Sequence, residues 1–245
     1  MEAMPDGDYL PKSTMGTDKV NLVLIASGSG TDADAIMKAW KTGWLPEVNP
    51  PTLISTKRDA GCIEKAKALG IRSVIIDRRD HTDLDVFNNT LRDTLLTHFT
   101  DLVFLVGCVV KIHPVPGIDT YNIHPADPEQ FGGKNMYGLR VHEYVLRDVL
   151  DQIYRGRKTA ADRFFTYPTV HEVDEKFDSG HHLYRQDVEI PKKLIGDLAS
   201  KKLSPEEGAG DLQQVVLPYE WLMLPTAVKS AARRILERRK EGIGN

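Results

Sequence analysis

The chain has 245 residues, of which 41% are hydrophobic and 27% charged, and its net charge at pH 7 is −3. These values are ordinary for a water-soluble globular protein, and they exclude a disordered chain and a globally basic partner of nucleic acid. The two cysteines, Cys62 and Cys108, are too few for a disulfide framework and favour a reducing, cytoplasmic location. No apolar run approaches the about 18 residues of a membrane span, and residues 1–19 lack the apolar centre of a signal peptide. We therefore expect a disordered amino-terminal arm and no membrane partner.

Residues 20–107 alternate between apolar runs and helical patterns. The expected strands are VNLVLIAS (20–27), PTLIST (51–56), RSVIID (72–77) and DLVFLVG (101–107), and the expected helices cover 32–40, about 60–69 and about 84–98. The near-continuous β-branched run VNLVLIAS predicts a strand that is buried on both faces. Strands that alternate with helices predict parallel βαβ units in an open sheet, where ligands bind beyond the carboxyl ends of the strands.

After residue 120 the pattern changes. A short strand YNIH (121–124), a glycine-rich loop and a helix over about 141–153 are expected first. The runs PTVHEV (168–173) and HHLYRQDVEI (181–190) then alternate as two antiparallel strands do, and one or two helices close the chain.

Together the patterns predict an α/β fold with an open, mostly parallel Rossmann-like sheet flanked by helices and a C-terminal antiparallel extension. We expect a single domain over residues 20–245. Its first half, 20–120, would bind phosphate, and its second half, 121–245, would carry the catalytic residues.

The turn between the first strand and the first helix is a candidate phosphate site. Backbone N–H groups at a helix N-terminus bind anions, and the helix dipole adds to the attraction. The residues concerned are Gly28, Ser29, Gly30 and Thr31, followed by Asp32. The pattern Gly28-x-Gly30-x-x-Ala33 also fits a dinucleotide fingerprint, with Arg58 as a candidate for a 2′-phosphate, so an NADP-binding oxidoreductase stays open. A tight turn without a ligand is the third interpretation.

The segment YNIHP places an amide and an imidazole side by side. On a strand, Asn122 and His124 project from the same face about 7 Å apart, while Ile123 points into the core. An amide donor and an imidazole are the groups needed to stabilise an oxyanion and move a proton in acyl transfer. The alternative is a structural Asn and a packed His.

The connection HEVDEKFDSG adds carboxylates: Asp174, Glu175 and Asp178. A carboxylate close to His124 would raise the pKa of the imidazole toward neutrality, whereas a solvated loop would do nothing of the kind. The histidines of this region lack the spacing of a metal site, so no metal is expected: His171, His181 and His182.

In this order, the motifs resemble those of the folate-dependent formyltransferases. The similarity runs from about residue 20 to residue 225. It is carried by IASGSGTDADAI (25–36), ISTKRDAGCIEKAKALGI (54–71), NIHP (122–125), GGKNMYGLRVHEYV (132–145) and TVHEVDEKFDSG (169–180). The resemblance implies transfer of the formyl group of 10-formyltetrahydrofolate to the amine of 5′-phosphoribosylglycinamide in purine biosynthesis, by direct attack through a tetrahedral intermediate.

The resemblance also implies roles for individual residues. The catalytic residues would be Asn122, His124 and Asp178. The substrate phosphate would bind on the Gly28 to Thr31 turn beside Asp32, with Gly133 close to the acceptor amine and Glu220 on the ribose. The folate cosubstrate would contact the segments that contain Val109, Val110, Lys111, Ile112, Val173 and Asp174, in the half 121–245 and the loop before it. No metal takes part.

The sequence departs from the family pattern at three site positions. Asp32 replaces the usual Asn, Val110 replaces an Arg that helps to hold the pterin, and Trp221 replaces a His. A different amine acceptor, such as a nucleotide-linked amino sugar, and a non-catalytic ligand-binding relative therefore stay open as alternatives. The basic segment KSAARRILERRK (229–240) is interpreted as a solvated face or as the contact of a homodimer, not as a nucleic-acid site.

Overall fold

The structure is a computed structural model, and it describes residues 18–174 and 180–242. The strands are β1 (Leu22–Ala26), β2 (Thr52–Ser55), β3 (Arg72–Ile75), β4 (Leu102–Leu105), β5 (Asp119–His124), β6 (Phe165–Thr166), β7 (Thr169–Glu172), β8 (His182–Arg185) and β9 (Val188–Glu189). The helices are α1 (Thr31–Lys41), α2 (Gly61–Leu69), α3 (Leu84–Thr97), α4 (Pro128–Phe131), α5 (Leu139–Tyr154), α6 (Lys192–Ala199) and α7 (Pro205–Lys240), with a short 3₁₀ turn at Arg78–Asp80.

Seven strands form one sheet in the order β3-β2-β1-β4-β5-β7-β8. The first five are parallel, and β7 and β8 extend the sheet in antiparallel pairing. The predicted fold class is therefore confirmed. The order reverses its direction at β1, because β2 lies on one side of it and β4 on the other, and such a reversal opens a crevice at the carboxyl ends of the two strands.

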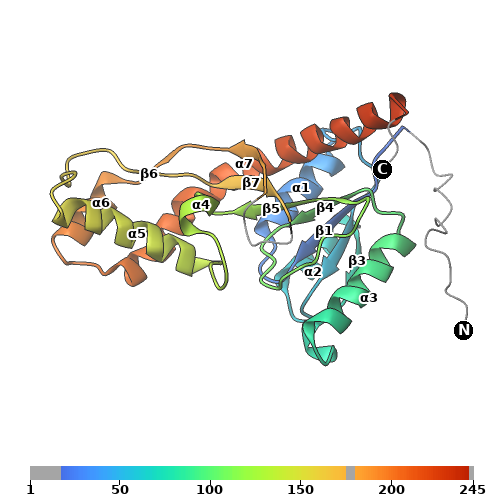
Figure 1. Ribbon diagram of the computed structural model, residues 1–245, viewed down its shortest axis with the longest axis horizontal. Coiled ribbons are helices and arrows are strands. Elements are labelled where there is room, and N and C mark those ends of the chain that lie inside the picture. The colour runs from blue at the N-terminus through green and yellow to red at the C-terminus, as the bar shows by residue number, and fades with distance from the viewer. Residues whose placement is uncertain (1–17, 175–179, 243–245) are drawn as a thin grey trace, which may run out of the picture.

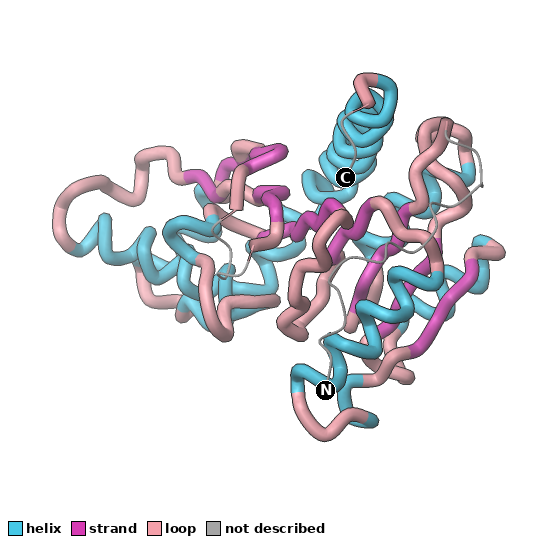
Figure 2. Tube along the Cα trace, turned by 45° about the vertical axis from the view of Figure 1, so that its right-hand side comes forward, coloured by secondary structure: helices cyan, strands magenta, loops and turns pink. Residues whose placement is uncertain are grey.

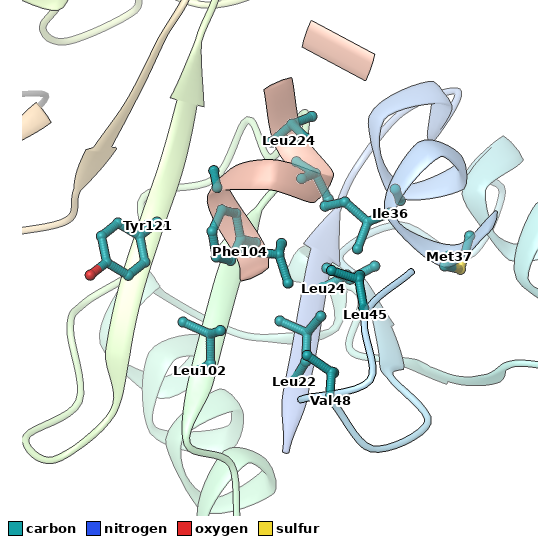
Figure 3. Close-up of a cluster of buried hydrophobic side chains, with 14 of the residues drawn as sticks. Leu22, Leu24, Ile36, Met37, Leu45, Val48, Leu102, Phe104, Tyr121 and Leu224 are labelled. Atoms are coloured by element: carbon teal, nitrogen blue, oxygen red, sulfur yellow. The ribbon is translucent and has the colours of Figure 1, made fainter. Parts of the chain in front are cut away.

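Both faces of the central strands β1 and β4 are buried, whereas the edge strands β3 and β8 are largely exposed. Along β1, Leu22 and Leu24 enter one core, whereas Val23 and Ile25 enter the core on the opposite face. Helices α1, α2 and α7 cover the first core, and α3 covers the second. Figure 3 shows Phe104 of β4 among the side chains of the first core, with α7 above it. The period-two alternation of each central strand thus requires a helix layer on either side.

A third apolar cluster lies at one end of the sheet. It is formed by α5, α6, β9 and the beginning of α7, with Phe164 fully buried among them. Figures 1 and 2 show these elements grouped to one side of the sheet, and Figure 1 shows α7 running from this group along the length of the molecule. α7 therefore contributes side chains to two cores.

The basic residues of α7 are engaged within the chain. Arg238 pairs with Asp119, Arg239 pairs with Asp101, and Arg233 pairs with Glu47 at 2.8 Å. Their partners lie on loops and strand ends at the amino side of the sheet. These pairs tie the end of α7 to the sheet, so the basic residues are not simply a solvated face, as one interpretation of the sequence had it.

Several local features differ from the sequence prediction. The run HHLYRQDVEI is two strands, because Gln186 donates its backbone N–H to Pro168 at 3.1 Å and β9 then pairs with β6 in a separate two-stranded sheet. Helices α4 and α6 were not predicted. The chain closes with one helix, α7, which continues through Pro218 and Pro225. In the described ranges, none of the helices combines the length and the apolar character needed to cross a lipid bilayer.

Packing of α7 on the sheet can be tested with two leucines two positions apart. Leu224 is fully buried, whereas Leu222 is 76% exposed. We expect Leu224→Ala to lower the free energy of unfolding by about 2 to 5 kcal/mol, because it leaves a cavity in the core. Leu222→Ala should change it by less than about 0.5 kcal/mol. Urea unfolding measures both, and similar losses in the two variants would contradict the packing described.

Candidate active site

A cavity of about 880 Å³ lies at the carboxyl ends of β1, β4 and β5, where the strand order reverses. The described residues to which the resemblance gives a role all line this cavity: Gly28, Ser29, Gly30, Thr31, Asp32, Val109, Val110, Lys111, Ile112, Asn122, His124, Gly133, Val173, Asp174 and Glu220. The predicted catalytic Asp178 lies outside the described residues. The volume of the cavity is within the range of small-molecule sites, which is about 300 to 1,000 Å³.

The glycine turn packs tightly on the start of α2. Gly30 has φ +75°, and a Cβ placed on it would lie 2.3 Å from the Cβ of Cys62, so the position excludes any side chain. Gly30 is also the N-cap of α1 and makes no side-chain capping hydrogen bond. The N–H groups of the first turn of α1 are therefore presented at the cavity as an anion-binding end of a helix.

Ser27 ties together the strand ends beneath the cavity. Its N–H donates to Gly107 at 3.1 Å, and its Oγ accepts the N–H of Val109 at 3.1 Å. The same Oγ lies 2.6 Å from Oγ1 of Thr56, which follows β2. One buried serine thus joins the ends of β1, β2 and β4.

A buried asparagine holds the loop that follows β4. Asn88 of α3 donates to the carbonyl of Lys111 at 3.2 Å and accepts the N–H of His113 at 2.8 Å. Two bonds from one rigid amide fix the backbone of residues 111–113. Sequence reasoning did not select Asn88, because its role depends on packing between α3 and a distant loop.

Asn122 and His124 point away from the core that receives Ile123, as predicted for alternate residues of a strand. Asn122 also meets His171, its partner across the antiparallel pair of β5 and β7. Nδ2 of Asn122 lies 3.3 Å from Nε2 of His171, and Nδ1 of His171 lies 2.9 Å from the carbonyl of Glu172. Because a carbonyl only accepts, Nδ1 of His171 carries the proton, and in the neutral ring Nε2 accepts from the Asn122 amide. One N–H of that amide is thereby fixed, and the orientation of the other follows.

His124 is buried next to a second histidine, His142 of α5. Nε2 of His124 donates to the carbonyl of Phe131 at 3.0 Å, which fixes the ring. Burial, followed by the charge of His124, lowers the pKa of His142 to about 4. His142 is therefore neutral at physiological pH, and it adds no positive charge beside His124.

The glycine-rich loop after α4 uses three residues with positive φ: Gly133 (+105°), Asn135 (+68°) and Gly138 (+59°). Asn135 thus adopts the left-handed conformation at a position without a glycine. Asparagine is one of the few side chains that tolerate the left-handed region. The loop can therefore lie along the cavity wall.

Two acidic residues, Asp32 and Glu220, line the cavity together with the glycine turn. Asp32 is the second residue of α1, and Glu220, which is 4% exposed, comes from α7. Burial raises the pKa of Asp32 to about 6 from its ordinary 3.8, and a hydrogen bond from Trp221 opposes part of this rise. Burial and then the charge of Asp32 raise the pKa of Glu220 well above its ordinary 4.5.

Arg58, the candidate for a 2′-phosphate, is not directed at the cavity. Its guanidinium pairs with Asp77 at 3.3 Å and with Asp80. Sequence reasoning also missed residues that line the cavity: His142, His171, Gln213, Gln214 and Tyr137. The motifs GGKNMYGLRVHEYV and TVHEV contained the two histidines, but only their packing gives them a function beside His124 and Asn122.

The fold and the cavity define the class of protein. The model of the formyl transferase family matches residues 20–210, and the chain therefore belongs to this family. Among curated relatives, it is 28% identical to the chloroplastic phosphoribosylglycinamide formyltransferase of Vigna unguiculata over 83% of this chain. It is 23% identical to the phosphoribosylglycinamide formyltransferase of Dictyostelium discoideum, over 66% of this chain and 92% of the relative.

Solved structures agree with the fold. Glycinamide ribonucleotide transformylase 1 of Geobacillus kaustophilus has a TM-score of 0.64 at 25% identity, with coverage of 87% of this chain and 99% of that one. Glycinamide ribonucleotide transformylase 1 of Symbiobacterium toebii has a TM-score of 0.67 at 22% identity, with coverage of 94% of this chain and 93% of that one. The chain spans 62% and 61% of the length of the Vigna unguiculata and Arabidopsis thaliana relatives.

The raised pKa of Asp32 predicts that replacing its carboxyl group by a neutral one stabilises the protein. Because the pKa of Asp32 is about 6 in the folded state and 3.8 ordinarily, its contribution to stability is full below pH 4 and is lost as the pH rises to about 6. Asp32→Asn should therefore raise the free energy of unfolding at pH 7.5 by about 1 to 3 kcal/mol, and by much less at pH 5.

Asp34→Asn is the matched control, since Asp34 lies in the same helical turn but pairs with Lys38 at 2.7 Å. It should be neutral or destabilising by less than about 1 kcal/mol at both pH values. Urea unfolding at the two pH values measures the effect. Equal or lower stability of Asp32→Asn at pH 7.5 would show that the carboxylate is not penalised.

Proposed function

We propose that this protein transfers the formyl group of 10-formyltetrahydrofolate to the amine of 5′-phosphoribosylglycinamide, a step of purine biosynthesis. One observation carries the proposal: in a chain of the formyl transferase family, Asn122 and His124 line the same cavity as the glycine turn and the loop 109–112. The names of the relatives, which are phosphoribosylglycinamide formyltransferases, support the same acceptor.

The acceptor would occupy the end of the cavity formed by α1 and α7. Its phosphate would bind the backbone N–H groups from Gly28 to Thr31, where the N-terminus of α1 attracts an anion. Glu220 would accept hydrogen bonds from the ribose, and the amine would lie beside Gly133 and the β5 strand. The distance from the turn to Asn122 then sets the length of acceptor that fits.

The residues present also suit a folate. The loop after β4 gives the cavity an apolar wall through Val109, Val110 and Ile112, and Val173 faces it from the end of β7. A flat pterin ring would pack on these side chains, with Lys111 and Asp174 as its polar neighbours. Asn88 holds the backbone of this loop, so the wall is formed before a ligand arrives. The cosubstrate supplies a formyl carbon bonded to a nitrogen that leaves.

The chemistry requires an oxyanion donor and a path for one proton. Asn122 would donate its second amide N–H to the formyl oxygen as the acceptor amine attacks the formyl carbon. A protonated His124 would donate to the same oxygen, and Asp178 would keep it charged and organise a water. The new C–N bond forms, the C–N bond to the folate breaks, and the proton lost by the attacking amine is gained by the departing folate nitrogen.

A formyltransferase for another amine, such as a nucleotide-linked amino sugar, is the second candidate, and Asp32 beside the glycine turn is the observation that favours it. Screening of acceptors with 10-formyltetrahydrofolate separates the two. Formylation of an amino sugar nucleotide without formylation of glycinamide ribonucleotide would reject the first proposal. We further propose a cytoplasmic enzyme that needs no metal and no nucleic acid, which could act as a homodimer.

The central test is formyl transfer by the wild type and by Asn122→Ala. Loss of one preorganised oxyanion donor lowers kcat by about 10² to 10³-fold, and we expect a loss of this size with an unchanged fold. Asn89→Ala, which removes the same amide from the exposed face of α3, is the matched control and should keep full activity. Near-native turnover by Asn122→Ala would reject the assigned role, with His124→Ala as the second variant.

His171 should act on Asn122 and not on the substrate. His171→Phe keeps the ring volume but removes the acceptor of the amide N–H, so we expect kcat to fall by about tenfold, the loss of about one hydrogen bond, with little change in KM for either substrate. His171→Gln, which offers an oxygen at a similar position, should recover most of the rate. If both variants lose activity equally, the hydrogen bond to Asn122 is not what His171 provides.

A further inference from the structure

Helix α4 ends on the peptide unit that holds the imidazole of His124. The carbonyl of Phe131 accepts the N–H of Nε2 of His124 at 3.0 Å. The N–H of the same peptide unit, which belongs to Gly132, donates to the carbonyl of Pro128 at 2.9 Å. Because a trans peptide unit is planar and its N–H and C=O point in opposite directions, the bond to Pro128 aims the carbonyl at His124. The orientation of the ring therefore depends on the position of α4.

A helix of one turn needs support from outside. α4 has four residues, and forming a single helical turn fixes several residues for few hydrogen bonds, which is unfavourable. Asp127 supplies the support at the N-cap. Its carbonyl accepts the N–H of Phe131 at 2.8 Å, and its Oδ1 accepts the N–H of Glu129 at 3.0 Å. Asp127 is 5% exposed, so these bonds form away from bulk water and fix the beginning of α4.

The second carboxylate oxygen of Asp127 is tied to the sheet. Oδ2 lies 3.2 Å from Nη2 of Arg185, the last residue of β8. The guanidinium of Arg185 also lies over the ring of Tyr167, 4.1 Å from the ring centre. An arginine that is held by an aromatic face and pairs with a buried carboxylate restrains its partner more than a solvated surface pair does.

Arg185 and His124 belong to one row of the sheet. Thr169 of β7 lies opposite His124 of β5 on one side and opposite Arg185 of β8 on the other. Residues that lie opposite each other across antiparallel strands project from the same face of the sheet. α4 is therefore attached to this row twice: its N-cap binds Arg185, and its last carbonyl binds His124.

We propose that Asp127 and Arg185 are positioning residues for His124: through α4 they hold the proton of Nε2 on the carbonyl of Phe131, so that the imidazole acts through Nδ1. Neither Asp127 nor Arg185 is among the residues that line the cavity, so they act on the ring and not on a ligand. The inference rests on the proposed function for the reaction that His124 serves. It does not rest on it for the state of the imidazole, which is measured without substrate.

This arrangement determines which proton His124 can transfer. A backbone carbonyl only accepts, so Nε2 keeps its proton whether the ring is charged or neutral, and the proton that is gained and lost sits on Nδ1. If α4 were released, the ring could turn, and the neutral ring would also populate the tautomer that is protonated on Nδ1. Part of the molecules would then present the wrong nitrogen. This lowers kcat with little change in KM, because the other residues of the cavity still bind the substrates.

The tautomer of His124 is read from long-range ¹H–¹⁵N spectra recorded without substrate over pH 6 to 10, in which the neutral forms are compared. The chain has eight histidines, and the signal that His124→Ala removes identifies His124. We expect the neutral ring of the wild type to carry its proton on Nε2. Asp127→Ala and Arg185→Met should each show a mixture of the two tautomers.

Arg163→Met is the matched control. Arg163 also lies over an aromatic ring, that of Phe165, at 4.9 Å, and it pairs with the carboxylate of Glu189 at 2.6 Å. This pair joins β6 to β9 and does not include α4. The control should therefore keep the tautomer and the kcat of the wild type.

Formyl transfer is measured in parallel. Asp127→Ala and Arg185→Met should each lower kcat by about five- to tenfold, the loss of about one hydrogen bond, while KM for either substrate changes by less than about twofold. Arg185→Lys keeps the charge and should recover part of the rate. Asp127→Asn keeps the cap but not the charge, and its kcat should lie between those of Asp127→Ala and the wild type. If Asp127→Ala does not fold, Asp127→Asn and Arg185→Met provide the test.

Two spectroscopic results would overturn the inference. One is a neutral wild-type ring that carries its proton on Nδ1. The other is a wild-type tautomer in both Asp127→Asn and Arg185→Met, whatever their stability or rate, since the two residues would then be structural only.

The kinetic results separate this inference from the proposed function. Tautomers that change as expected in a protein that does not formylate glycinamide ribonucleotide would reject the proposed function alone. Formyl transfer by the wild type with an unchanged kcat in the Asp127 and Arg185 variants would reject this inference alone.

Discussion

The hydrogen bonds of Ser27 hold the site in place. The sheet reverses its winding at β1, so the loops after β1 and β4 leave in different directions and a cavity opens between them. Ser27 joins the ends of these two strands and reaches Thr56 after β2, all within the interior. The glycine turn begins at the residue after Ser27, and the loop 109–112 begins at Val109, whose N–H donates to Oγ of Ser27. The Ser27 side chain therefore supports both walls of the cavity.

The features that could be predicted from the sequence are those that depend on the alternation of residues within one strand. The alternation in β1 and the common face of Asn122 and His124 follow from neighbouring residues, and the structure agrees with them. Contacts between distant segments could not be predicted in this way. Arg58 was a reasonable ligand for a phosphate until Asp77 and Asp80, about twenty positions on, proved to hold it. Helix α6 and the break before β9 likewise depend on packing in the third cluster.

The position of α7 has a consequence for how the chain folds. The strands of the seven-stranded sheet precede α7 in the sequence, so one of the helices that cover the first core is made after all of them. Until residues 223–235 are made, the apolar face that contains Phe104 is covered by α1 and α2 alone, and exposed apolar surface promotes association between chains. We therefore expect the nascent sheet to need protection from association until α7 has been made.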